Sequence, residues 1–149
     1  MTTPWKINSE NNNCYAYALD QHNPSATYKL IPGDENFINT CGKLIEAVHR
    51  DRPEMYPVTT LQQQCEKGYR KIYMAVSSES SEENRGDFHF WRQEPNYYWT
   101  HKLGISLPSH VDADGKPIHD PQYSNNSYTP HDYNISCGFY CISTTKKQE

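Results

Sequence analysis

The sequence predicts an α+β domain in which N-terminal helices pack on a C-terminal antiparallel sheet. Segments before residue 69 carry helix caps and apolar residues at helical spacing, whereas most later segments are short aromatic or β-branched runs typical of strands. Helices first and strands second is the order found when helices cover one side of an antiparallel sheet. At 149 residues the chain has apolar material for one core, so residues 1–149 are expected to form a single domain.

Three helices are expected in the first half of the chain. The stretch "NNCYAYALD" offers Asn12 or Asn13 as the N-cap of a helix that ends before the next proline. Apolar residues from Phe37 to Val48 recur at helical spacing in "NFINTCGKLIEAVHRD", which predicts an amphipathic helix of three turns. A third, short helix is expected in "TTLQQQCEKG", with a threonine cap and a stop at Gly68.

Four strands are expected in the second half. They lie in residues 69–78, 88–93, 97–102 and 134–143, each of which is dense in aromatic or β-branched residues. Between the first two strands, the polar stretch "SSESSEENRGD" (77–87) is typical of a solvated loop. These strands are expected to form an antiparallel meander.

The composition excludes several classes of protein. Leu, Ile, Val and Phe supply only 23 of 149 residues, so the twelve Tyr and three Trp must provide much of the core. The net charge of −4 and the scattered lysines and arginines give no basic stripe, which argues against a nucleic-acid partner. The N-terminus "MTTPWKINSENNN" lacks the pattern of a signal peptide, and no apolar run is long enough to cross a membrane. The expected location is the cytoplasm, with no membrane partner.

The cysteines are interpreted as reduced thiols. Their number is odd, so at least one has no partner within a monomer, and a cytoplasmic chain keeps the others reduced. They are Cys14, Cys41, Cys65, Cys137 and Cys141. In "CGFYC" the two cysteines would lie on one face of a strand but about 13 Å apart, so a shared zinc ion would require a bulge at Gly138. No structural metal and no cofactor are expected.

The acidic stretch "VDADGKPIHDP" (111–121) is interpreted as a hairpin turn. A calcium loop of the EF-hand type needs a further oxygen donor before its glycine and a bidentate glutamate at its end, and both are absent here. The "DADG" sequence instead has the residues that tight hairpins favour.

Cys14 is the first candidate for chemistry. It lies directly after "NNN", in the first turn of the first expected helix, where unsatisfied N–H groups and the helix dipole favour an anion. This position predicts a lowered pKa and a nucleophilic thiolate. The alternative is that Cys14 is a small buried residue, the usual role of a free cysteine. A nucleophilic cysteine also needs a base, which the sequence must supply elsewhere.

His89 and His101 are the candidate base and its partner. If residues 88–93 and 97–102 pair about Pro95, His89 opposes His101 and their side chains can touch on one face. A register shifted by two residues keeps both on that face as diagonal neighbours, whereas a shift of one separates them. With an even register, His89 acts as base and His101 orients it. The alternative is a purely structural cross-strand pair.

The order of these residues resembles that of the papain-like cysteine hydrolases. The similarity rests on "NCYAYAL", "FHFW" and "WTHK", and is greatest for the small NlpC-type peptidases, in which the third residue is often a second histidine. The resemblance implies a papain-like fold with Cys14 as nucleophile, His89 as general base and His101 as orienting residue. Unlike most of those enzymes, this chain lacks an Asp-Cys-Ser-Gly start and an export signal.

This reading implies a cysteine hydrolase, either a peptidase or an amidase, or a related acyl transferase. Its partner would be a protein or peptide substrate with a scissile peptide or isopeptide amide. Trp91 and Trp99 would line an aromatic groove for the substrate, and Asn13 would add a donor near the nucleophile. Asp112 or Asp120 is an alternative third member in place of His101. A competing reading is a catalytically inactive, aromatic-rich module that binds proteins or a host factor.

Overall fold

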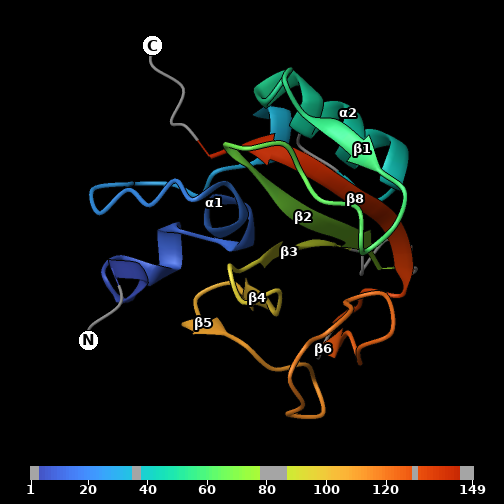
Figure 1. Ribbon diagram of the computed structural model, residues 1–149. Helices are drawn as coiled ribbons and strands as arrows, with labels where there is room; N and C mark the ends of the chain where they lie inside the picture. Colours follow the sequence, from blue (N-terminus) through green and yellow to red (C-terminus); the bar gives the residue numbers. More distant parts are fainter. Residues whose placement is uncertain (1–3, 35–37, 78–86, 129–130, 145–149) are drawn as a thin grey trace.

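The computed structural model describes residues 4–34, 38–77, 87–128 and 131–144. In these ranges the chain forms two α-helices, three short 3-10 helices and eight strands. Six of the strands make one antiparallel sheet with the order β1-β8-β2-β3-β4-β5, which Figure 1 shows, and β6 and β7 pair separately. The mixed α+β class with helices preceding most of the sheet is therefore confirmed.

The two helices begin at side-chain caps. Helix α1 spans Cys14–Leu19, and the side chain of Asn13 caps it by accepting a hydrogen bond from the N–H of Ala16. Helix α2 spans Cys41–Asp51 and is capped in the same way by Thr40. An oxygen from a cap residue satisfies one of the N–H groups that a helix start leaves without a partner, which explains both starting points. Part of the predicted second helix, including Phe37, lies outside the described residues.

The predicted strands form close to their expected positions. They are β2 (Tyr69–Val76), β3 (Phe88–Gln93), β4 (Trp99–Lys102) and β8 (Ile135–Ser143). The remaining strands are short: β1 (Tyr56–Val58), β5 (Pro108–Ser109), β6 (Ser127–Tyr128) and β7 (His131–Asp132). The 3-10 helices are η1 (Pro4–Lys6), η2 (Ser9–Asn11) and η3 (Pro32–Asp34). Most of the predicted polar loop, residues 78–86, lies outside the described residues.

One predicted helix is wrong. Residues 59–68 form bends and turns instead of a helix, and strand β1, which precedes them, was not expected. The threonine cap does form a local bond, since Thr60 accepts from the N–H of Gln63. However, this segment has few apolar residues to bury, and packing rather than capping stabilises most short helices.

The sheet separates two cores. On one face, helix residues such as Tyr15 and Leu44 pack with Ile72, Met74 and Phe90 of the sheet. On the other face, an aromatic cluster is covered by loops instead of helices. Its members are Val58, Tyr73, Ala75, Trp91, Trp99, Ile118, Tyr133, Phe139 and Cys141. Strand β2 contributes alternate residues to the two faces, as its period of two requires.

A β-bulge in β8 changes the face on which its side chains lie. Met74 pairs with Gly138 but Ala75 pairs with Ser136, so Cys137 is an extra residue between them. Gly138 adopts a φ of 99°, which glycine tolerates best. Cys137 therefore points to the helix side and Cys141 to the aromatic side, although they are four positions apart in one strand. The bulge that a shared zinc site would need is present, but it moves the two cysteines apart.

The expectation that all cysteines are reduced is wrong for this structure. Cys41 is bonded to Cys137, and Cys65 is bonded to Cys141. The first disulfide ties the start of α2 to β8 on the helix side, and the second ties the segment after β1 to β8 on the aromatic side. Cys14 is the free cysteine. The odd number of cysteines requires at least one without a disulfide partner, and in this structure that cysteine is Cys14, the candidate nucleophile.

Candidate functional site at Cys14, His89 and His101

The β3–β4 hairpin brings the two histidines onto one face. Trp91 pairs with His101, and Gln93 pairs with Trp99, so the register is shifted by two residues from a pairing centred on Pro95. The predicted direct opposition of His89 and His101 is wrong, but the even register and the shared face are confirmed. The longer connection arises because the N–H of Glu94 bonds to the carbonyl of Tyr98. The histidines are diagonal neighbours, within reach of long or aromatic side chains.

The two imidazoles form a hydrogen bond whose direction is fixed by a backbone carbonyl. Nε2 of His89 lies 2.9 Å from Nδ1 of His101, and Nε2 of His101 lies 2.9 Å from the carbonyl oxygen of Val111. Since a carbonyl only accepts, Nε2 of neutral His101 carries the proton and its Nδ1 is an acceptor. Nε2 of His89 must then be the donor. Nδ1 of His89 is left with a lone pair, and it makes no hydrogen bond to the described residues.

The surroundings keep both imidazoles neutral. His89 is 2% exposed and His101 is fully buried. Burial lowers the pKa of His89 well below its ordinary value, and the neighbouring His101 lowers it further. Burial also lowers the pKa of His101. Tyr133 stacks on His89 with 5.0 Å between ring centroids, and Trp91 packs edge-on against it. A neutral, oriented imidazole is the form in which a histidine accepts a proton.

Cys14 is a protonated thiol at neutral pH. It is 8% exposed, and burial raises its pKa to about 12, with a further contribution from the charge of Asp87. The backbone N–H groups of Phe90 and Tyr15 act in the opposite direction. The prediction that the helix start lowers this pKa is therefore wrong for the resting structure, because desolvation outweighs the dipole of a six-residue helix.

Cys14 lies at the point where strands β3 and β4 separate. Their regular pairing ends at Trp91 and His101, and Phe90, one residue further along β3, directs its N–H to the sulfur of Cys14. Phe90 directly follows His89 in the chain, so Cys14 lies beside the strand that carries the candidate base. Cys14 packs with Phe90 in the helix-side core, however, whereas the ring of His89 packs with Trp91 and Tyr133 of the aromatic cluster on the other face of the sheet. In the described part of the chain no hydrogen bond joins Cys14 to His89.

Lys102 is a residue near this site that the sequence interpretation missed. It is fully buried at the end of β4, and its Nζ donates to the carbonyls of Ser9, at 2.7 Å, and Gly104, at 2.5 Å. Burial lowers its pKa to about 8, whereas interaction with Cys14 raises it. The charge of Lys102 in turn lowers the pKa of Cys14. The sequence did contain a signal for this residue. Lys102 directly follows His101 in a predicted strand, and because neighbouring strand residues face opposite sides of the sheet, its side chain was expected on the face opposite His101.

The residues predicted to bind substrate have other roles in this structure. Trp91 and Trp99 are both fully buried in the aromatic cluster, so they form core and not an open groove. Asn13 uses both ends of its amide: its oxygen caps α1, and its nitrogen donates to the carbonyl of Leu30. The amide is therefore not free to donate to a substrate in this conformation.

The alternative third members are engaged in loop structure. The carboxylate of Asp112 accepts from the N–H groups of Asp114, Lys116 and Asn125, which holds the predicted hairpin turn together. Asp120 accepts from the N–H of Gln122. Neither carboxylate bonds to His101 among the described residues. Within the same residues, no group of three or more His, Cys, Asp or Glu side chains is arranged to hold a metal ion.

The fold and the site define a small disulfide-bonded α+β protein in which a buried cysteine lies beside a strand bearing a histidine pair. A curated relative, insoluble matrix shell protein 1 of Ruditapes philippinarum, is 30% identical over 121 residues, which is 79% of this chain and 74% of that protein. The chain belongs to the family of this shell protein. No family model matches the chain. No solved structure matches it. None of the helices in the described ranges is long and apolar enough to span a membrane.

Proposed function

We propose that this protein is a cysteine hydrolase, a peptidase or amidase, or a related acyl transferase that uses Cys14, His89 and His101. The observation that carries the proposal is the ordered imidazole pair. The carbonyl of Val111 fixes the proton on His101, His101 fixes the proton on His89, and Nδ1 of His89 is left as a base. The resemblance to papain-like hydrolases implies the same roles for His89 as base and His101 as orienting residue. The proposed substrate is a peptide or isopeptide amide.

The proposed reaction starts from a neutral thiol and a neutral imidazole. Nδ1 of His89 takes the proton of Cys14 as the sulfur attacks the carbonyl carbon, which forms the S–C bond and an oxyanion. The same proton then passes to the leaving amine as the C–N bond breaks. Water or an amine next attacks the thioester and releases Cys14. Lys102 supplies a positive charge that stabilises the sulfur anion as it forms.

A cytoplasmic location stays a prediction from the sequence, and two observations weigh against it. Disulfides persist in oxidising compartments and are rare in the cytosol, and this chain has two. The name of the relative places that protein in a shell matrix. We therefore propose that the chain works outside the cytosol.

A second candidate function is a matrix or binding protein without catalysis. The raised pKa of Cys14 favours it, because a thiol with a pKa of about 12 is inert unless a base takes its proton. The name of the shell relative also fits this candidate. The two candidates differ in whether the reactivity of Cys14 depends on His89.

Alkylation of Cys14 by iodoacetamide tests the proposal directly. In the oxidised protein Cys14 is the free cysteine, so the site of labelling is unambiguous. We expect the native protein to be alkylated at neutral pH, and His89→Asn to slow the reaction by about 100-fold, the lower end of what a general base contributes. Incubation with p-nitrophenyl acetate should leave one acetyl group on Cys14, detectable by mass spectrometry. Cys14→Ser should prevent both modifications.

A matched control separates base catalysis from a change in packing. Tyr128→Phe removes a hydroxyl that lies 3.3 Å from Nε2 of His101 but leaves the bond between the histidines intact. This variant should react at nearly the wild-type rate. If His89→Asn alkylates as fast as the wild type while remaining folded, Cys14 is an ordinary thiol and the matrix or binding function is the better account.

A further inference from the structure

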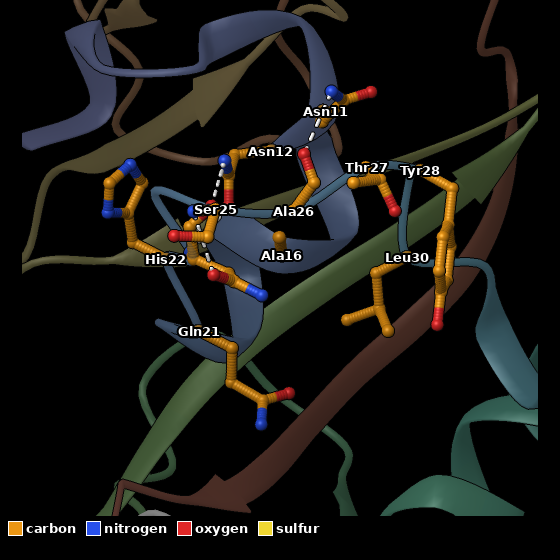
Figure 2. Close-up of a pocket in the computed structure, with 11 residues that line it drawn as sticks. Asn11, Asn12, Ala16, Gln21, His22, Ser25, Ala26, Thr27, Tyr28 and Leu30 are labelled. Carbon is orange, nitrogen blue, oxygen red and sulfur yellow. Dashed lines mark hydrogen bonds between the residues drawn. The ribbon is translucent and has the colours of Figure 1, made fainter.

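A pocket unrelated to the histidine pair lies beside helix α1. It encloses about 400 Å³, which is within the range of small-molecule sites. Its walls come from η2, from α1 and from the segment of residues 21–30 that follows α1. Figure 2 shows Ala16 of α1 at the centre of the view, with Gln21, Thr27, Tyr28 and Leu30 around it.

Asparagine side chains hold this pocket in shape. Asn12 is 1% exposed, and its amide nitrogen donates to the carbonyls of Asn8 and Asn23, both at 2.9 Å. Its amide oxygen accepts from the N–H of Asn23 at 2.8 Å. Asn11 donates to the carbonyl of Ala26 at 3.1 Å. These bonds, several of which Figure 2 marks, fasten the segment of residues 21–30 to η2, so the pocket exists before a ligand arrives.

The lining mixes apolar and polar side chains and carries no Asp, Glu, Lys or Arg; its histidine, His22, is bonded through Nε2 to the carbonyl oxygen of Ile7. Two other hollows in the described part of the chain differ in this respect, since one includes Lys71 and the other includes Arg70, Lys71 and Glu94. An anion or a cation that entered this pocket would lose part of its hydration, and no oppositely charged side chain in the wall would compensate for that loss. The pocket therefore suits a neutral, polar ligand.

The side chains that face this pocket offer hydrogen bonds and an aromatic surface. Gln21, Thr27 and Tyr28 make no side-chain hydrogen bond to the described residues, so their amide and hydroxyl groups are available. Ala16 and Leu30 add an apolar floor. Tyr28 is 76% exposed, and its face can cover the C–H surface of a ligand.

We infer that this pocket binds a neutral saccharide. A sugar ring presents hydroxyl groups on its edge and C–H groups on its faces, which match the amide and hydroxyl groups of Gln21 and Thr27 and the ring of Tyr28. One or two sugar units fit the volume. The pocket is built from residues other than Cys14, His89 and His101, so the inference does not depend on the proposed catalysis.

Titration of the ¹⁵N-labelled, disulfide-intact protein tests this inference. The probes are two neutral disaccharides, cellobiose and N,N′-diacetylchitobiose, an acidic one, digalacturonic acid, and a capped triglycine as a neutral amide. We expect a neutral disaccharide to shift the amide signals of residues 21–30. Gln21→Ala and Tyr28→Ala should each weaken its binding by about 2- to 10-fold, the effect of losing one hydrogen bond or ring contact.

Two control variants accompany this titration. Tyr123→Ala removes a tyrosine that is 86% exposed but lies outside the pocket, and it should leave binding unchanged. Cys14→Ser should also bind normally, which separates this site from the proposed catalytic one. The inference is overturned if no disaccharide shifts these signals, if digalacturonic acid binds more tightly than the neutral sugars, or if only capped triglycine binds there.

Discussion

His101 is a buried residue whose two ring nitrogens have separate tasks. One nitrogen donates to the carbonyl of Val111, and the other accepts from His89. A phenyl ring or an amide at this position would supply at most one of these two bonds in the same geometry. His101 is thus a positioning residue in the proposed mechanism, because it acts through His89.

Replacing His101 should affect stability and reactivity together. His101→Phe keeps the ring but leaves the buried N–H of His89 without an acceptor, which should lower the free energy of unfolding by about 1–3 kcal/mol. Alkylation of Cys14 should slow as well, because His89 can then rotate or change tautomer. Urea denaturation and iodoacetamide kinetics measure the two effects. Loss of stability without any change in alkylation would mean that His101 has only a structural role.

The buried histidines also predict how stability depends on pH. Their pKa values are lowered in the folded state, so below about pH 6.5, the ordinary value, the unfolded chain binds more protons than the folded one. Stability should therefore fall as the pH decreases below 6.5, by up to about 1.4 kcal/mol per pH unit for each histidine. Denaturation at several pH values tests this. In the double variant His89→Phe and His101→Phe, the slope between about pH 6.5 and 5 should be clearly smaller.

At the level of single elements, burial distinguishes what the sequence could predict from what it could not. The strands β2, β3 and β8 were predictable because aromatic and β-branched residues mark both of their faces. The sequence could predict that His89 and His101 share one face of the β3–β4 hairpin. It could not predict which residues pair, because the pairing depends on the bond between Glu94 and Tyr98. The pKa of Cys14 was not predictable, because it depends on burial by residues distant in sequence.

Strand β8 shows why the disulfides could not be predicted. On a regular strand Cys137 and Cys141 would face the same way, and no pairing across the sheet would be suggested. The bulge at Gly138 sends them to opposite faces, where each meets a different partner. A single positive φ angle therefore determines which thiols can meet.

This role of Gly138 can be measured by substitution. An added Cβ would meet only a ring atom of Tyr140, at 3.8 Å, so Gly138→Ala should act through the backbone and not through a clash. Because φ is 99° at this position, we expect a loss of about 1–2 kcal/mol in the free energy of unfolding. Gly42 in helix α2 is a matched control with no atom within 4 Å of an added Cβ. Gly42→Ala should instead stabilise the protein by about 0.4–1 kcal/mol.

For the molecule as a whole, the two disulfides compensate for a limited aliphatic core. The Cys41–Cys137 bridge spans 96 residues and the Cys65–Cys141 bridge spans 76, and both attach to β8, which lies between β1 and β2 in the sheet. One joins the helix layer to the sheet, and the other joins the loops of the aromatic side to it. Cross-links over such long loops restrict the unfolded chain strongly, so both faces of the sheet gain stability from them.

Reduction should therefore destabilise the entire domain. Each bridge is expected to contribute about 2–5 kcal/mol, and a marginally stable domain does not tolerate the loss of both. We expect the thermal midpoint to fall steeply when a reductant is added, whereas the oxidised protein should release one titratable thiol per chain on denaturation. Cys41→Ser combined with Cys137→Ser should loosen the contact between α2 and β8, which hydrogen exchange of α2 amides would report. If the purified protein instead shows five thiols and the same thermal midpoint with and without reductant, the bridges do not form in solution, and a cytoplasmic setting becomes the better interpretation.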